Sequence, residues 1–138
     1  MISNIPHNYE PSDDEEFMNP LHSEYFRKRL VEWRLQLVKE SQEAVQNLNE
    51  QGTEPDPIDS ANQEAERRFE LRKRDRARKL IIKIDEAISR IEDGSYGYCE
   101  ITGDPIGIKR LRARPIATLC IDAQEAHEKK EKVYKDNW

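Results

Sequence analysis

Residues 54–61 read Glu-Pro-Asp-Pro-Ile-Asp-Ser-Ala, a short stretch rich in proline and acid. They separate two long segments with helical periodicity, residues 23–50 and residues 60–92. A short, proline-rich turn between two long helices predicts an antiparallel hairpin. The eight residues of the turn are then the exposed tip of that hairpin.

The composition of the chain favours long solvated helices over a broad core. Of its 138 residues, 36% are hydrophobic and 37% are charged, against roughly 45–50% and about 25% in an ordinary globular domain. Such a balance suits helices that meet along a narrow apolar seam, with one small globular cluster beside them. The formal net charge of −5 argues against a general DNA-coating protein but leaves room for local basic patches.

Both helical segments carry the apolar spacing of a coiled coil, in alternating steps of four and three residues, although Glu40 interrupts the pattern in the first. In the first helix, for which Ser23 is the expected N-cap, the seam is Phe26, Leu30, Trp33, Leu37 and Ala44. In the second helix, which ends at Gly94, it is Ala77, Ile81, Ile84, Ile88 and Ile91, widened by Leu80 and Ala87.

The predicted fold is mainly α: a long antiparallel coiled coil on a small globular base. Residues 1–22 form an N-terminal arm that docks on the base through Phe17 and Met18, and residues 23–93 form the coiled coil with its tip at 52–61. Residues 94–138 form a degenerate zinc ribbon and a C-terminal helix. The glycines and proline of residues 96–108 predict tight turns and short strands, and the closing helix runs from about Ile121 to Tyr134.

The two cysteines have the outline of a zinc ribbon but lack its ligands. The knuckle positions are Cys99 with Thr102 and Cys120 with Ala123, and a structural zinc site needs four ligands. We therefore expect no zinc, no required cofactor and two reduced thiols. Packing is expected to offset the missing metal, from Tyr98, Ile101, Ile106, Ile108, Leu111, Leu119 and Ile121. With no signal peptide and no membrane-spanning run, the expected compartment is the cytoplasm.

Several stretches resemble the DksA/TraR family over about residues 9–132. In the C-terminal region they are residues 96–100, Ile-Gly-Ile-Lys-Arg-Leu at 106–111, 113–115 and 119–122; in the N-terminal half they are 17–19, 26–27, 30 and 32–34. Asp56, Asp59 and Ala61 match the family's tip motif, D-x-x-D-x-A. The departure is the loss of two of the four zinc-binding cysteines, so the chain resembles the cysteine-poor members.

The resemblance implies a transcription regulator that binds RNA polymerase and not promoter DNA. The coiled coil would enter the secondary channel of the polymerase. The tip residues Asp56, Asp59 and Ala61 would then act near the catalytic centre and change open-complex stability, notably at ribosomal RNA promoters. The resemblance also implies coupling to the stringent response through guanosine tetraphosphate (ppGpp), with Arg76, Lys83 and Arg114 at the phosphate-binding positions. A further lysine of the family is Gln124 here, which removes one charge-assisted contact. No membrane partner is expected, and the chain is expected to be a monomer.

The tip has a purely structural interpretation as well. Asp56 before Pro57 suits an N-cap, and Ser60 with Gln63 suits a capping box. One carboxylate can cap while another reaches out. Acid–base catalysis is not expected, because no histidine, lysine or apolar cleft lies near the tip in the sequence.

Residues 67–79 support an alternative function, direct nucleic-acid binding by a coiled-coil protein. The run contains Arg67, Arg68, Arg72, Lys73, Arg74, Arg76, Arg78 and Lys79. It can equally be a solvated helix face that pairs with acids of the first helix such as Glu32, Glu40 and Glu43. The overall acidity of the chain favours the solvated face or a protein partner.

Overall fold

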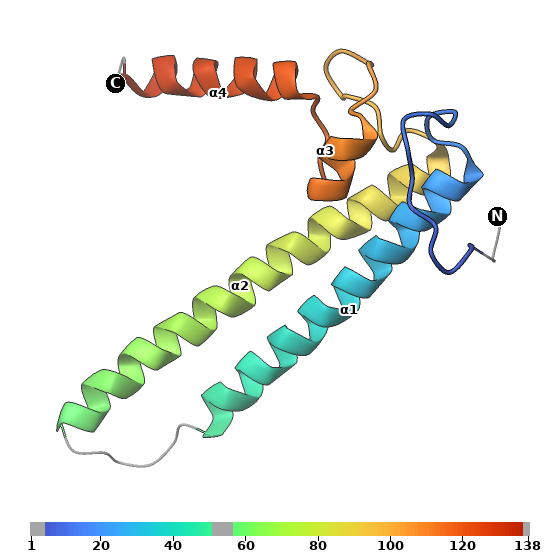
Figure 1. The fold of residues 1–138 in the computed structure, drawn as a ribbon. Helices are drawn as coiled ribbons and strands as arrows, with labels where there is room; N and C mark the ends of the chain where they lie inside the picture. The colour runs from blue at the N-terminus through green and yellow to red at the C-terminus, as the bar shows by residue number, and fades with distance from the viewer. Residues whose placement is uncertain (1–4, 51–56, 137–138) are drawn as a thin grey trace. The chain divides into compact units, whose positions relative to one another are not determined.

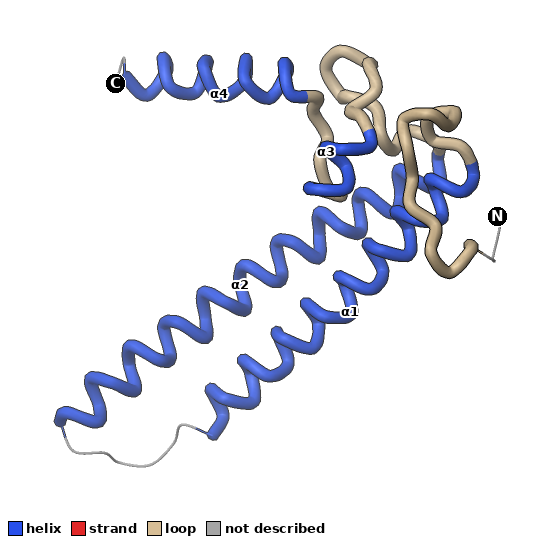
Figure 2. Tube along the Cα trace, in the orientation of Figure 1, coloured by secondary structure: helices blue, strands red, loops and turns tan. Residues whose placement is uncertain are grey.

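The computed structural model describes residues 5–50 and 57–136. Its helices follow in the order α1 (Pro20–Glu50), α2 (Pro57–Asp93), α3 (Ile108–Ala113) and α4 (Ile121–Asp136), as Figure 1 shows. Within the described ranges no residue belongs to a strand (Figure 2). The chain divides into two compact units: unit 1 combines Met1–Leu30 with Ala87–Trp138, and unit 2 is Val31–Glu86.

Unit 2 is an antiparallel pair of helices, the parts of α1 and α2 that lie side by side in Figure 1. Arg34 near its beginning donates a 2.7 Å hydrogen bond to Asp85 near its end, which sets the antiparallel direction. The buried side chains between the helices are Leu37, Ala44, Ala77 and Ile84. The prediction of a mainly helical protein with a long antiparallel helix pair is confirmed.

The seam of unit 2 is narrow, as the composition predicts. Trp33 and Ile81, two of the predicted seam residues, are only half-buried. Leu35, Phe69 and Ile82 lie outside the seam, with 63%, 58% and 52% of their surface exposed. Because full burial of a large apolar side chain stabilises by roughly 1.5–3 kcal/mol, most of the stability of the pair comes from a few positions.

The first helix begins three residues before the predicted N-cap, so the prediction for Ser23 is wrong. Asn19 caps α1: its Oδ1 accepts hydrogen bonds from the N–H groups of Leu21 (2.9 Å) and His22 (3.0 Å). Pro20 then takes the first helical position, where its missing N–H costs nothing. The N–H of Ser23 is already bonded within the turn, to the carbonyl of Asn19 at 3.1 Å.

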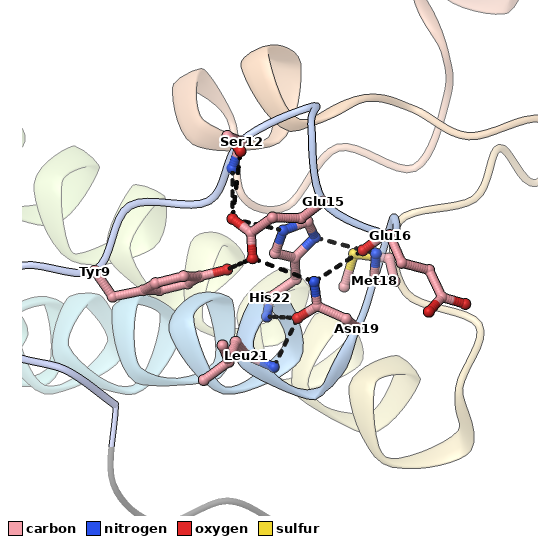
Figure 3. Close-up of polar contacts among 8 residues, drawn as sticks. All are labelled: Tyr9, Ser12, Glu15, Glu16, Met18, Asn19, Leu21 and His22. Atoms are coloured by element: carbon pink, nitrogen blue, oxygen red, sulfur yellow. Dashed lines mark hydrogen bonds and ion pairs between the residues drawn. The ribbon is translucent and has the colours of Figure 1, made fainter.

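A network of polar contacts ties the N-terminal arm to the beginning of α1 (Figure 3). Its centre is Glu15, whose carboxylate accepts hydrogen bonds from the Tyr9 hydroxyl at 2.7 Å and from the Ser12 N–H at 3.3 Å. His22, which is fully buried, accepts the Met18 N–H at Nδ1 (3.1 Å), and its Nε2 lies 3.8 Å from Glu15 Oε1. The arm is therefore held by directed hydrogen bonds in addition to apolar packing.

Phe17 and Met18 contact the turn that follows α2. The Phe17 ring meets Tyr98 edge to face with ring centroids 5.5 Å apart. Gly97 has a φ of +93°, and a Cβ there would come within 2.9 Å of Met18 Sδ and Cγ. Only glycine both adopts this backbone conformation without strain and leaves room for the methionine.

The region after α2 turns tightly, as predicted, but forms no strands within its described residues. A single antiparallel bridge joins Tyr98 and Pro105, and the hexapeptide Ile108–Ala113 is a short helix, α3, that the sequence did not indicate. The strand prediction is wrong because Gly97, Gly103 and Gly107 all have positive φ, which breaks any extended run.

The core of unit 1 differs in part from the predicted one. Ile106, Ile108 and Leu111 are buried, but Tyr98, Ile101 and Ile121 are 38%, 67% and 55% exposed. In their place the core takes the buried residues Phe26, Leu30, Ala87, Tyr96, Cys99, Ile116 and Ala117. The Tyr96 hydroxyl donates a 2.7 Å hydrogen bond to the carbonyl of Pro115, and burial raises the pKa of Tyr96.

The closing helix, α4, agrees with the predicted C-terminal helix and runs from Ile121 to Asp136. Ala123 is buried and Gln124 half-buried, and the side chains from Glu125 to Lys135 are exposed. Among the helices that the structure describes, none combines the length and apolarity that a membrane-spanning helix requires.

Glu15→Gln is expected to destabilise the protein at pH 7 and to lose that effect in acid. The Tyr9 hydroxyl, above all, lowers the pKa of the Glu15 carboxyl below its ordinary value. A lowered folded-state pKa means that the ionised carboxylate stabilises the fold fully above the ordinary value of about 4.3 and stops doing so as the pH falls through the lowered one. The melting-temperature gap between wild type and variant, followed by circular dichroism, should therefore close between pH 7 and about pH 3.

Glu16→Gln is the matched control, because the neighbouring Glu16 side chain is exposed and makes none of the side-chain contacts of the arm. Its melting temperature should follow that of the wild type at both pH values. An equal gap for both variants, or a Glu15→Gln gap that persists in acid, would contradict the role of the Glu15 carboxylate.

Candidate functional site

The tip residues fall at the edge of the described chain. Asp56 lies outside the described residues, and the side chain of Asp59, in the first turn of α2, is also outside them. Ala61 is exposed on α2. Pro57 is the first residue of α2, the position that suits a proline preceded by a capping residue. The role of the three residues stays a prediction.

Two of the three residues predicted to bind ppGpp lie on one face of a helix. Arg76 and Lys83 are both exposed on α2, and their separation of seven residues is about two turns, or roughly 10 Å. Arg114 is exposed in unit 1, at the C-cap of α3, where its N–H bonds to the carbonyl of Arg110 at 2.8 Å. Gln124 donates a 3.0 Å hydrogen bond to Glu128 along α4. Arg76 and Lys83 thus lie on the same side of α2 in unit 2, about two turns apart.

Unit 2 contains a groove that the sequence did not indicate. It has a volume of about 550 Å³ and lies between α1 and α2. Its apolar wall is Trp33, Leu37, Phe69, Ala77 and Leu80, and its polar rim is Gln36, Glu40, Arg72, Lys73 and Arg76. The small side chain of Ala77, which is 2% exposed, leaves the space that a larger seam residue would fill. An alanine at a predicted seam position, Ala77, is the signal that could have revealed the groove.

The basic run at residues 67–79 is a solvated face. Its arginines and Lys79 are exposed, and only Lys73 is half-buried. Within the described part of the chain, none of the ion pairs joins this run to Glu32, Glu40 or Glu43. The expected pairing with those glutamates is therefore not found there, although Glu40 shares the rim of the groove with Arg72, Lys73 and Arg76.

The region around Cys99 folds as a knuckle. The N–H of Cys99 bonds to the carbonyl of Asp104 at 2.8 Å, and the N–H of Gly103 returns to the carbonyl of Cys99 at 2.9 Å. Thr102 contacts the second cysteine, with its hydroxyl 3.9 Å from Cys120 Sγ, and accepts the Asp104 N–H at 3.2 Å. Backbone hydrogen bonds close the turn, and Thr102 places a hydroxyl at one of the predicted ligand positions.

Donors around the Cys99 sulfur favour a thiolate there. The Thr102 hydroxyl, followed by the backbone N–H groups of Cys120, Thr102 and Ile101, lowers the pKa of the Cys99 thiol to about 6. Donors that would surround a metal-bound sulfur therefore stabilise the free sulfur anion. Both cysteines are free thiols, Cys99 buried and Cys120 half-buried.

The donor set at the knuckle does not fit a structural zinc ion. The four ligand positions hold two thiols, one hydroxyl and the methyl group of Ala123, which is buried. No group of three or more His, Cys, Asp or Glu side chains that could hold a metal occurs among the described residues. Two thiolates fall short of the four ligands that zinc takes in such sites.

Two family models match the chain along most of its length. Residues 22–91 match the N-terminal domain of the DnaK suppressor protein DksA. Residues 94–129 match the prokaryotic dksA/traR C4-type zinc finger. The second match covers a region that holds only two cysteines, Cys99 and Cys120.

Similar proteins of two bacteria carry one name, RNA polymerase-binding transcription factor DksA. The protein of Caulobacter vibrioides (strain NA1000 / CB15N) is 52% identical over 94% of this chain and 92% of its own length. That of Escherichia coli (strain K12) is 46% identical over 90% of this chain and 83% of its own length. Among solved structures, transcription factor DksA2 from Pseudomonas aeruginosa is similar, with a TM-score of 0.77 and 39% identity over 84% of this chain and 90% of that one.

These likenesses confirm the predicted resemblance and agree with the antiparallel helix pair of unit 2 and the knuckle of unit 1. The family consists of transcription regulators and not enzymes, which confirms the expectation that no catalytic site is to be sought at the tip. The chain belongs to the DksA family, as a member that keeps only two of the four cysteines of its zinc finger.

Proposed function

We propose that the protein is a cytoplasmic transcription regulator that binds RNA polymerase as a monomer. The observation that carries the proposal is the identity of 52% and 46% with two proteins named RNA polymerase-binding transcription factors, each over at least nine-tenths of this chain. Identity at this level extends through both long helices and the ribbon, so the surfaces that the partner contacts are expected to be shared.

In this proposal the helix pair enters the secondary channel of the polymerase, and the tip acts near the catalytic centre. A narrow pair of helices is a suitable shape, because two packed helices 8–10 Å apart occupy little cross-section. Asp56 and Asp59 carry negative charge to the end of the pair, where it can perturb elements that move during initiation. Destabilised open complexes, notably at ribosomal RNA promoters, are the proposed result.

Asp59→Asn is expected to leave polymerase binding within about twofold and to abolish inhibition at a ribosomal RNA promoter. The substitution keeps the size of the side chain and removes only its charge, so a tip that acts by electrostatics loses its effect. The measurement is promoter-specific transcription with purified polymerase, alongside a binding assay on the same protein preparations. Inhibition at the wild-type level by this variant would remove the tip from the mechanism.

Asp75→Asn is the matched control, the same change at an exposed position farther along α2. It should inhibit as the wild type does. A loss of function in both variants would mean that the net charge of the helix pair matters and that the tip has no special role.

The alternative function, direct nucleic-acid binding through residues 67–79, has the exposure of those cations in its favour. The salt dependence of binding distinguishes this alternative from the polymerase-binding function. Attachment to polymerase without affinity for free DNA supports the regulator, whereas tight binding to naked duplex DNA that weakens steeply with salt supports the alternative.

We further propose that ppGpp is an effector, with its phosphates held in part by Arg76 and Lys83 on α2 and by Arg114. Lys83→Ala should raise the ppGpp concentration needed for half-maximal inhibition by about fivefold, as expected for one exposed charge contact of about 1 kcal/mol. Arg78→Ala, on the opposite side of α2 and also exposed, is the control and should leave that concentration unchanged. Equal shifts in both variants would point to general charge and not to this site.

Zinc is not part of the proposed function. Metal analysis of the purified protein should find well under one zinc per chain, and a chelator should leave its circular dichroism unchanged, because two thiolates cannot complete the site. A double variant with Thr102→Cys and Ala123→Cys restores four thiols on the same backbone and should bind about one zinc per chain. Stoichiometric zinc in the wild type would show that the chain finds other ligands.

A further inference from the structure

A cavity in unit 1 lies where the N-terminal arm, α1 and α3 meet. Its volume is about 640 Å³, within the range of 300–1,000 Å³ that is common for small-ligand sites. The arm contributes Pro11, Ser12 and Asp13 to its lining. None of the residues proposed to bind ppGpp (Arg76, Lys83 and Arg114) lines it.

Three cations from two helices line the cavity: Arg29 of α1, and Lys109 and Arg112 of α3. Arg29 is held in place, because its Nη1 donates a 2.9 Å hydrogen bond to the carbonyl of Arg112 and its guanidinium carbon lies 5.9 Å from the centre of the Tyr25 ring. Lys109 is exposed and takes part in none of the ion pairs formed by the described residues. The cavity therefore has one cation held in place, Arg29, and one outside the ion pairs of the described residues, Lys109.

Two carboxylates oppose these cations. Asp13 lines the cavity, and Glu10 lies 3.7 Å from Arg112, with 72% of its side chain exposed. Three positive charges against two negative ones leave one positive charge at the cavity. A net positive site in a chain of formal charge −5 is a local feature that the overall composition does not explain.

The remaining lining is apolar or aromatic. Pro11 and Ile108 are buried, and the Tyr25 ring is packed edge to face against Tyr9 at 6.3 Å and Phe26 at 5.1 Å. The wall formed by the arm is fixed as well, since Ser12 donates to the Glu15 carboxylate from both its N–H (3.3 Å) and its hydroxyl (3.4 Å). The cavity thus offers an apolar and aromatic surface for a ring beside a cluster of donors.

We propose that this cavity binds a small organic phosphate. The phosphoryl group lies against Arg29, Lys109 and Arg112, and the ligand's apolar or aromatic body lies against Pro11, Tyr25 and Ile108. A phosphate monoester fits better than a carboxylate, because it carries close to two charges at neutral pH and three acceptor oxygens for donors that converge from two helices. Arginine in particular presents a planar fork that matches phosphate oxygens.

The test is a titration of the full-length chain, followed by amide chemical shifts, with phenyl phosphate, inorganic phosphate and benzyl alcohol as probes. Phenyl phosphate should shift the amides of residues 12–13, 25–29 and 108–113 and bind at least fivefold more tightly than either of the other two. Binding no tighter than that of inorganic phosphate would overturn the part of the proposal that concerns the apolar wall. The absence of localised shifts up to tens of millimolar would overturn all of it.

Three variants test whether the positive charge at the cavity strengthens phosphate binding. Lys109→Ala should weaken phenyl phosphate binding at least fivefold, and Asp13→Asn should tighten it. Lys28→Ala is the matched control, since Lys28 is exposed on α1 next to Arg29 and does not line the cavity. The control should leave the affinity within twofold of the wild type, and equal weakening by Lys28→Ala and Lys109→Ala would overturn the site in favour of general attraction.

Discussion

A seam one or two side chains wide is the constraint on which unit 2 depends. Leu37, Ala44, Ala77 and Ile84 fill it, and the other side chains that the structure describes in unit 2 are wholly or partly exposed. A chain with as many charged as apolar residues can still form long helices, because each turn needs only one buried contact. The consequence is that nearly every charged group of the pair stays on the surface, where a partner can meet it.

Unit 1 is held together by several kinds of interaction around the Cys99 knuckle. The Cys99 knuckle is closed by backbone hydrogen bonds, Thr102 contacts Cys120, and Tyr96 anchors the following segment through its bond to Pro115. Packing from Phe26 and Leu30 completes the core. Zinc contributes folding energy outright in a four-thiolate site, whereas the donor set here offers only two thiols, and these hydrogen bonds and apolar contacts stabilise unit 1.

Features that depend on the spacing of apolar residues could be predicted from the sequence. Features that depend on a single local contact could not. The spacing of Phe26, Leu30 and Leu37 determines the helix pair. Asn19 and Ser23 are both good N-caps, however, and the choice between them depends on Pro20 following Asn19. α3 is too short to show a period, and the exposure of Ile101 follows from a loop geometry that no pattern encodes. The tip motif can be recognised in the sequence because its residues lie within one short stretch, whereas the cavity beside Tyr25 joins residues as far apart as Pro11 and Ala113.

The half-buried Trp33 on the wall of the groove in unit 2 gives the protein a built-in optical probe. The emission of an indole shifts with the polarity and water access of its surroundings, and cationic neighbours such as Arg72 and Arg76 line the same groove. Trp138, the second of the two tryptophans, is the last residue of the sequence and can be replaced by phenylalanine. Fluorescence from the remaining indole would then follow the helix pair alone, without a dye, as a partner closes around it.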